Sequence, residues 1–331
     1  MANYLVREGI DTYHVYGVET TEGTKASTVG KTLGLTQSFS FNPNNNIVRP
    51  RGSVGYLTDD NDTTTSRDAQ AVLRGNFEGS ISIGFQPNNF EFMEFVMGSA
   101  SGAGTTASPY EYPQASASTI ADKKKYLKIP SLTWSTNALW DGTGDSADGG
   151  ADLLGAKIGS CDIRAASGEP VSVSLTVPFM KLSPKNTIDN GVAIDADDVY
   201  HFTGCKVEVP TGTAIDDIIS DFTLSINNGV SFRHGLGSHV PKKLFSGNRE
   251  ITFSMNLTNE GTRWMKALDA FTVYSNIVLE FTGDNGRTFE VTLFNVATND
   301  INVQGTHPNP VDENVTLHPT HMKCEEITDA A

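Results

Sequence analysis

Two distant stretches of the chain carry the same short pattern. The stretch "GNFEGSISIG" covers residues 75–84, and "GNREITFSMN" covers residues 247–256. Each begins with Gly-Asn, has Glu at its fourth position, and then alternates apolar with small polar residues. An internal repeat limits the fold more than composition does, because each copy has to form the same unit. The pair predicts a duplicated β unit, provided that other blocks repeat in the same order.

Further blocks do recur in the same order in both halves. After the opening pattern, each copy passes through Pro-Asn or Thr-Asn into a short helical run. One such match is weak, but several in order are hard to attribute to chance. The matched blocks are "YHVYGVE" (13–19) with "YHFTGCK" (200–206), "FSFN" (39–42) with "LSIN" (224–227), and "CDIRAASGEPV" (161–171) with "NDINVQGTHPNPV" (299–311). The sequence predicts two tandem domains of one fold.

The spacing of the blocks sets the expected domain boundaries. The first copy is longer, and insertions fall in surface loops. A polar, acidic stretch without an apolar period is typical of a linker. The predicted organisation is an N-terminal arm (1–12), a first domain (13–182) with inserted loops at 57–73, 98–122 and 141–152, a linker (183–198), and a second domain (199–331). The Gly/Ser/Ala-rich composition of residues 98–119 is typical of flexible filler.

Short alternating runs bounded by Gly, Pro, Asn and Asp indicate an antiparallel, mainly β fold. In "EPVSVSLTVPF" (169–179), Val171 to Phe179 place every second residue on one apolar face. In the second half, Ile251 to Leu257 do the same. The opposite faces are small, polar and uncharged, which fits a channel wall, a subunit contact or a Ser/Thr-rich solvent face. The candidates for this face are Ser80, Ser82, Ser172, Ser174, Thr252 and Ser254.

Each half is expected to carry one short helix with a single buried stripe. Apolar residues three and four apart share one helix face. In the first half these residues are Phe92, Phe95 and Val96, and in the second Trp264, Met265 and Leu268.

The charge balance is acidic. The net charge is −15, from 39 acidic and 24 basic residues. Proteins that grip nucleic acid need clustered Lys and Arg, so this balance argues against such binding, although a surface that nucleic acid passes without adhering remains compatible with it. No apolar run is long enough to span a membrane, and no signal-peptide pattern is expected at the N-terminus. Three cysteines give no disulfide framework.

No residue constellation supports catalysis, and no metal or cofactor is expected. His318, His321 and Cys324 have ligand-like spacing, but Pro319 interrupts the run and a fourth ligand is missing. The acidic stretch at 141–152 resembles a calcium loop only loosely, because Ser146 stands where the loop requires glycine.

The order of these blocks resembles the tail-tube proteins of long-tailed phages, once in each half. The elements that carry the resemblance are the opening strand "YHFTGCKVEV" (200–209), the strand "FTLSINN" (222–228), the Gly-Asn-x-Glu strand with its short helix, and the final strands such as "FEVTLFNVATNDI" (289–301). The resemblance covers nearly the whole chain and lies in the order of elements, without one diagnostic motif.

The resemblance implies a fold and an assembly. Domains of that family are β-sandwiches of two antiparallel sheets with one flanking helix, and six of them form a ring in which neighbouring sheets join into a barrel. A chain of two fused domains would close the ring as a homotrimer with pseudo-six-fold symmetry. Stacked rings form the virion tail tube, assembled in the host cytoplasm with other tail proteins. DNA would pass through the lumen without specific binding and without membrane insertion.

The resemblance also suggests a loop that reaches the next ring. By position, residues 57–73 are the best candidate, with Asp59, Asp60, Asp62 and Arg67 as contact residues and residues 240–244 as the shorter counterpart in the second half. The N-terminal stretch 2–10 is expected to be an arm that orders on assembly.

Two rival functions remain open at this point. A baseplate or adaptor ring, or a secretion tube, would share the same fold and sequence pattern. A carbohydrate-binding adhesive β-sandwich would instead expose aromatic side chains on loops, and Trp134, Trp140, Tyr110 and Tyr112 are its candidates.

Overall fold

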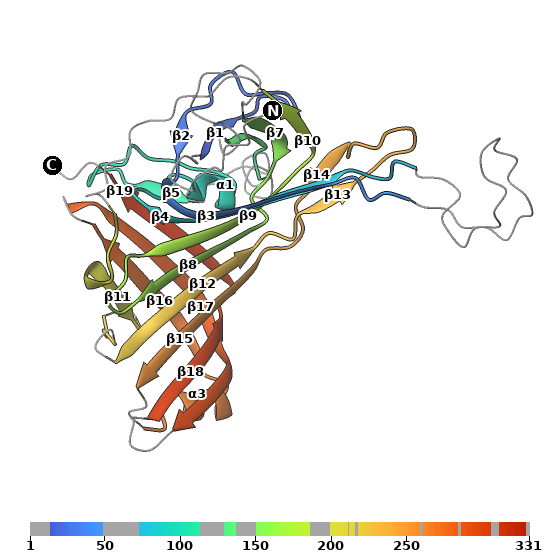
Figure 1. The fold of residues 1–331 in the computed structure, drawn as a ribbon. Coiled ribbons are helices and arrows are strands. Elements are labelled where there is room, and N and C mark those ends of the chain that lie inside the picture. Colours follow the sequence, from blue (N-terminus) through green and yellow to red (C-terminus); the bar gives the residue numbers. More distant parts are fainter. Residues whose placement is uncertain are drawn as a thin grey trace, which may run out of the picture.

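The computed structural model describes residues 14–48, 73–112, 129–136, 150–185, 199–210, 212–215, 218–258, 261–283, 286–305 and 311–328. As the alternation predicts, this part of the chain is mainly β, with large antiparallel sheets (Figure 1). Its helices are short: α1 (Met93–Met97), α3 (Arg263–Asp269) and the 3-10 turn η3 (Phe202–Gly204).

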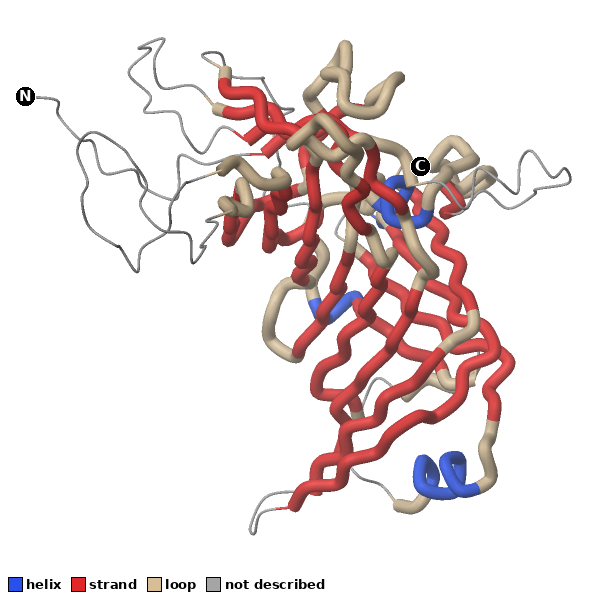
Figure 2. The backbone as a smooth tube through the Cα atoms, turned by 90° about the vertical axis from the view of Figure 1, so that its right-hand side faces the viewer, coloured by secondary structure: helices blue, strands red, loops and turns tan. Residues whose placement is uncertain are grey.

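The large sheet runs through both halves of the chain. Its strands follow the order β11-β16-β17-β18-β15-β12-β8-β9-β4-β3, and β19 and β5 branch from it. The side view shows that strands, drawn in red, run through most of the molecule (Figure 2). Their bounds are β3 (Gly34–Asn44), β4 (Glu78–Pro87), β5 (Tyr110–Tyr112), β8 (Ser160–Ala166), β9 (Ser172–Phe179), β11 (Cys205–Glu208), β12 (Ile219–Asn227), β15 (Glu250–Thr258), β16 (Val273–Thr282), β17 (Thr288–Gly305), β18 (Val311–His318) and β19 (His321–Ile327).

A second sheet of five strands belongs to the first half, and a two-stranded hairpin to the second. The five strands are β1 (His14–Val18), β2 (Lys31–Thr32), β6 (Leu132–Thr136), β7 (Ala151–Ala156) and β10 (Lys181–Pro184), in the order β10-β7-β6-β1-β2. The hairpin is β13 (Ser231–Arg233) with β14 (Lys243–Phe245). It lies beside the long β3-β4 hairpin, which projects from the body (Figure 1).

The alternating apolar faces build one connected core. Ile81, Ile83 and Phe85 are buried in the first half, and Phe253, Met255 and Leu257 in the second, as the sequence predicts. The apolar face of β9, with Val173 and Leu175 at its centre, is buried too. These residues all belong to a single hydrophobic cluster that continues from one half into the other. Burial of this apolar surface is the main driving force for folding.

The helices differ from the prediction. In α1, Phe95 and Val96 are buried, as expected. In α3, Trp264 is buried, but Met265 and Leu268 are 45% and 41% exposed, so the stripe predicted for the second helix was wrong. The physical reason is position. The first helix lies inside the molecule where the halves meet, whereas α3 lies at the end of the large sheet farthest from the five-stranded sheet (Figure 1).

The insertions in the first half are also more structured than predicted. The filler interpretation of residues 98–119 is wrong for the described part, because β5 pairs with β19 of the second half and buries Tyr112. The end of the 141–152 insertion enters strand β7, where Asp152 forms ion pairs with Lys25 and Lys185. The expected linker starts within β10, and its residues 186–198 lie outside the described part, as does the arm at 1–12.

The two halves of the large sheet repeat one strand order. In the first half the order is β3-β4-β9-β8, and in the second it is β12-β15-β18 followed by the second part of β17. Phe41 stands opposite Ile81, and Leu224 opposite Phe253, the residue that the opening pattern matches with Ile81. Phe41 therefore corresponds to Leu224, two residues from the position that the matched blocks gave. The duplication itself stays a prediction.

Candidate assembly surfaces

The two halves join edge to edge through β8 and β12. The strands are antiparallel, and their register runs from Ser160 opposite Asn227 to Ala166 opposite Asp221. On the apolar face, Ile163 and Leu224 stand opposite each other and are fully buried. We call this pairing the internal junction.

The strands that correspond to β8 and β12 in the other half have an open edge. Among the described residues, β3 pairs only with β4, so its second edge has no partner. In β17, residues 298–305 pair with β18 on one edge, whereas the pairing with β16 ends at Ala297. Val303 occupies the position that corresponds to Ile163. Ile163 lies opposite Val173, which lies opposite Phe85, and Val303 lies opposite Glu313, which lies opposite Leu257. The opening pattern, continued at the same offset, matches Phe85 with Leu257.

Both open edges expose apolar side chains. Phe39 on β3 and Val303 on β17 are each 38% exposed. Unpaired strand edges are templates for further pairing, and natural proteins usually cover or charge them. The open edges of β3 and β17 lie at different places on the large sheet. Pairing them within one copy of the chain would close this sheet on itself. They can pair between copies.

The six polar residues named from the sequence lie on one continuous face of the large sheet. One row of neighbours is Ser174, Asp162, Ser225 and Thr252, and the next is Ser172, Arg164, Thr223 and Ser254. Ser82 stands in an adjoining row between Ser40 and Thr176, and Ser80 lies opposite Asn42. The sheet thus brings Ser80, Ser82, Ser172, Ser174, Thr252 and Ser254 together on the side opposite the core. We call this side the polar face.

Side-chain hydrogen bonds and acidic groups characterise the polar face. The Asn256 amide donates to both carboxylate oxygens of Asp221, at 2.9 and 3.0 Å, and the Asn314 amide donates to Asn256. We restrict the polar face to strands β3, β4, β8, β9, β12, β15, β18 and residues 298–305 of β17. Within the described part of these strands, the charged residues on this face are acidic except for Arg164; the acidic ones are Glu78, Asp162, Asp221, Glu250, Asp300 and Asp312. The face is acidic on balance.

Aromatic packing holds the end of the first half against the second. Phe90, between β4 and α1, is fully buried and stacks on Phe289 with ring centroids 3.7 Å apart. Tyr200 and Phe281 complete this cluster. Sequence reasoning missed Phe90, since a single Phe in a polar turn gives no period to detect.

The buried carboxyl group of Glu326 links the β5 insertion to the segment that contains Phe90. Glu326 Oε1 accepts a hydrogen bond from the Phe90 N–H at 2.7 Å, and Oε2 accepts one from the Tyr112 hydroxyl at 2.9 Å. Burial raises the pKa of Glu326 to about 7, despite these two hydrogen bonds. The alternation of β19 could have located Glu326 on the core face, but not its partners from the other half.

The base of the β13-β14 hairpin caps α1 across the internal junction. Arg249 Nη2 donates to the carbonyls of Val96 and Met97, at 3.2 and 2.8 Å, and the Asn228 amide donates to Val96 at 3.1 Å. The last carbonyls of a helix lack partners within the helix, so these donors satisfy them. Further along the hairpin, the Phe77 N–H donates to His239 O at 2.7 Å.

The stacking residues Asp59, Asp60, Asp62 and Arg67 lie outside the described residues. Their expected counterpart at 240–244 is the second arm of the short hairpin, where β14 begins. The short hairpin contacts the root of the long one through Phe77 and His234, whose Nε2 lies 3.0 Å from Phe77 O. Both hairpins therefore project on the same side of the molecule (Figure 1).

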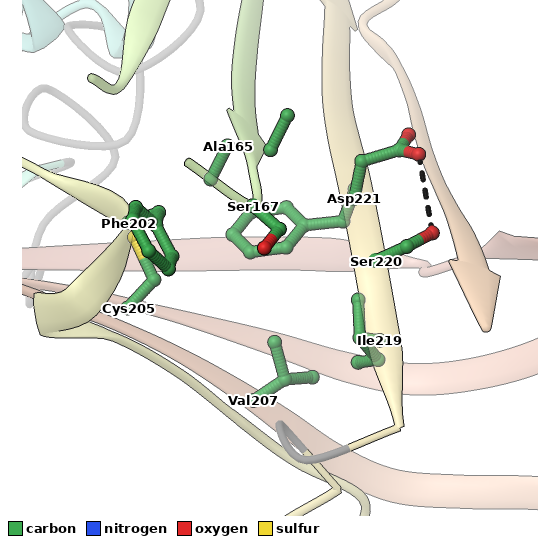
Figure 3. Close-up of a pocket in the computed structure, with 10 residues that line it drawn as sticks. Ala165, Ser167, Phe202, Cys205, Val207, Ile219, Ser220 and Asp221 are labelled. Carbon is green, nitrogen blue, oxygen red and sulfur yellow. Dashed lines mark hydrogen bonds between the residues drawn. The ribbon is translucent and has the colours of Figure 1, made fainter. Parts of the chain in front are cut away.

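One open pocket of about 230 Å³ lies beside the internal junction, between β8, β11 and β12 (Figure 3). Small and apolar side chains line it, among them Ala165, Val207 and Ile219, with a Ser220–Asp221 hydrogen bond at its rim. Burial raises the pKa of the Cys205 thiol to about 12, so this thiol is protonated at neutral pH. Cys205 is therefore not an activated nucleophile.

The aromatic residues of the adhesive interpretation that the structure describes do not form an exposed patch, and Tyr110 among them is partly buried. Trp134 and Tyr112 are buried in the core, and Trp140 lies outside the described residues. The candidate metal ligands are on strands: His318 ends β18, whereas His321 and Cys324 belong to β19. His321 stacks on Phe294, and Cys324 is buried. Within the described residues, no three His, Cys, Asp or Glu side chains gather as metal ligands would.

Comparison with known proteins adds one finding. A family model described as phage tail tube protein matches residues 9–318. No curated protein matches the chain. None of the helices in the described part is long and apolar enough to cross a bilayer.

Proposed function

The chain belongs to the phage tail tube protein family and has a structural role in the virion tail, and on this premise we propose that three copies close into a ring whose stacks form a channel for the genome. Each copy supplies two β units, and a head-to-tail contact generates a ring when its rotation closes. Six units per ring, as the resemblance implies, require three chains.

The observation that carries this proposal is the internal junction. There, β8 of the first half pairs with β12 of the second. We take this pairing as the pattern for the contact between copies, which the open edges of β3 and β17 would make. Transferring the register of β8 and β12 to these edges places Phe41 opposite Val303 of the next copy, because they correspond to Leu224 and Ile163. Asn42 then faces Asn302, and Ser40 faces Gln304. Edge pairing of this kind satisfies the open backbone groups of both strands.

In such a ring, we assign the lumen to the polar face. The apolar side of the sheet is occupied by the core, which leaves the polar face for the inside of the barrel. Short Ser and Thr side chains give a smooth wall. Acidic groups repel the phosphates of DNA and offer no cluster of Lys or Arg on which it would be retained. These properties support passage of the genome without specific binding.

Paired cysteines test the register. In a Cys205→Ser background, which removes the one described thiol that is not buried, we expect Asn42→Cys with Asn302→Cys to give disulfide-linked trimers under mild oxidation. Opposed residues on antiparallel strands lie about 4.5–5.5 Å apart between Cα atoms, within disulfide range. The internal equivalent, Ser225→Cys with Asp162→Cys, is the positive control, because these residues already face each other.

A shifted pair is the matched negative control. Asn42→Cys with Gln304→Cys keeps the same face but is two residues out of register, about 7–8 Å apart. Equal cross-linking of both pairs, or cross-linking of neither, would contradict the register. Electron microscopy of the concentrated protein separates the related functions: tubes support the tail tube, single rings at every concentration indicate an adaptor ring, and a persistent monomer would overturn the assembly.

A further inference from the structure

The second helix presents an unexpected apolar surface. Met265 and Leu268 on α3 are about half exposed, Phe271 just after the helix is 73% exposed, and Val273 opens β16 in an equally open position. We call these four residues the α3 patch. Soluble proteins seldom expose adjoining large apolar residues without a binding role.

The matched helix shows what covers such a surface. Met93 and Val96 of α1 correspond to Met265 and Leu268, and both are completely buried. The other half of the chain reaches the end of this helix, where Asn228 and Arg249, at the base of the β13-β14 hairpin, donate hydrogen bonds to the backbone carbonyls of Val96 and Met97. In this chain the end of α1 is thus in contact with the hairpin base of the other half.

The first half has a corresponding hairpin base, and it is apolar. The end of β3 and the start of β4 are joined there by a hydrogen bond from the Asn46 amide to Asn76 O at 3.0 Å and by a bridge between Val48 and Leu73. Ile47, Val48 and Leu73 are each more than half exposed. We call these three residues the hairpin-base patch. In the second half, Val48 and Leu73 correspond to Ser231 and Phe245, the first pair of the β13-β14 hairpin, which lies next to the Asn228 and Arg249 contacts to α1.

We propose that the α3 patch packs on the hairpin-base patch of a second copy of this chain. The inference rests on the proposed ring, since it continues the contact of the two open edges in the same head-to-tail order. Val273 connects the α3 patch with the open edge of β17, because it lies opposite Ala297, where this edge begins. Two exposed apolar patches then cover each other, in place of the polar Asn and Arg contacts of the internal junction.

Charge exchange tests this contact. Leu268→Lys places a charge in the centre of the α3 patch, and Val48→Glu places one in the hairpin-base patch. Both positions are exposed in the single chain, so each variant is expected to fold with an unchanged melting temperature. We expect each to raise the concentration needed for assembly by about tenfold or more, and the double variant to recover most of the loss. Light scattering and electron microscopy measure the assembly.

The control is Lys266→Glu, which changes the charge on the same helix but points away from the α3 patch, and we expect it to assemble normally. If Leu268→Lys assembles like the parent chain, or if the double variant is no better than the singles, the helix contact is wrong. The cysteine pair Asn42→Cys with Asn302→Cys, introduced into the same variants, distinguishes the two ideas. Trimer cross-linking with normal assembly of Leu268→Lys overturns the helix contact and leaves the ring intact.

Discussion

The internal junction and the two ends of the chain contain corresponding residues in opposite environments. Ile163 is fully buried, whereas its counterpart Val303 is partly exposed, and Val96 is buried whereas Leu268 is exposed. Sequence type is similar within each pair, so the difference comes from what each surface meets. One chain completes one contact between units and leaves the matching surfaces open. In the proposed ring, apolar residues at these ends are the remaining halves of an interface, and their exposure is a property of the single chain.

The strongest test of this comparison places the same charge at both positions. Ile163→Lys buries an ammonium group in the core, which costs about 4 kcal/mol or more. We expect this variant to unfold at a much lower temperature or to be insoluble. Val303→Lys, at an exposed edge, is expected to change the stability of the single chain by less than about 1 kcal/mol and to abolish assembly. Thermal unfolding and light scattering measure the two effects.

Equal destabilisation by both substitutions would show that the edge of β17 is part of the core of the single chain. Normal assembly of Val303→Lys would show that this edge is not an interface. Val303→Ile is the conservative control, and it should behave like the parent chain in both measurements.

Two aromatic residues extend the comparison from the strands to the contacts beside them. Phe90→Ala removes a ring that stacks on Phe289 between the halves, and a buried Phe→Ala change costs about 3–5 kcal/mol. Phe271→Ala removes an exposed ring from the α3 patch, so we expect less than about 0.5 kcal/mol in the single chain. The first variant should lower the denaturant midpoint, and the second should reduce only assembly. A large loss of stability in Phe271→Ala would place this ring within the fold.

Much of the fold could be predicted, because a strand in a half-buried sheet leaves a period of two in the sequence. That period placed Ile251 to Leu257 in the core and Thr252 and Ser254 on the opposite face. It could not fix the register. A shift of two residues keeps every side chain on its face of the sheet. Alternation therefore does not decide whether Phe39 or Phe41 is the residue of the first half that corresponds to Leu224.

The open edges and the α3 patch could not be predicted. An edge strand and a central strand have the same alternation, and only the pairing partners tell them apart. The spacing of Met265 and Leu268 places them on one helix face, but a spacing does not say whether anything lies over that face. The interpretation of the Gly/Ser/Ala-rich insertion as filler was wrong for a related reason, because the pairing of β5 with β19 depends on a distant strand. The composition of the insertion gives no information on the strand with which it pairs.

The Glu326 contact predicts a pH dependence for the link between the halves. Its pKa in the folded chain is about 7, above the value near 4.3 of an unfolded glutamate. The folded state therefore holds the proton more tightly, so this group stabilises the fold below about pH 4 and the contribution is lost as pH rises through 7. Relative to Glu326→Gln, which stays neutral, we expect the parent chain to lose up to about 3 kcal/mol between pH 4.5 and pH 8.

Denaturant unfolding of both chains across this range gives the difference directly. The comparison with Glu326→Gln removes the contributions of Glu19, Glu94 and Glu290, whose pKa values burial also raises. A difference that does not change with pH would mean that Glu326 keeps its ordinary pKa and that the β5 insertion is held by packing alone.

The smallest effect concerns the cap on α1, which α3 lacks within one chain. Arg249→Ala removes two hydrogen bonds to helix carbonyls from a half-buried guanidinium, and we expect a loss of about 1–3 kcal/mol in the denaturant midpoint analysis. Arg249→Lys should restore only part of it, since an ammonium group cannot reproduce the planar fork of donors. Lys266→Ala in the last turn of α3 is the matched change, with an expected loss below about 0.5 kcal/mol. If Arg249→Ala costs no more than Lys266→Ala, α1 is held by burial alone. The covering of one unit's helix by the next unit's hairpin base would then be passive packing, and the same would be expected of α3 in the ring.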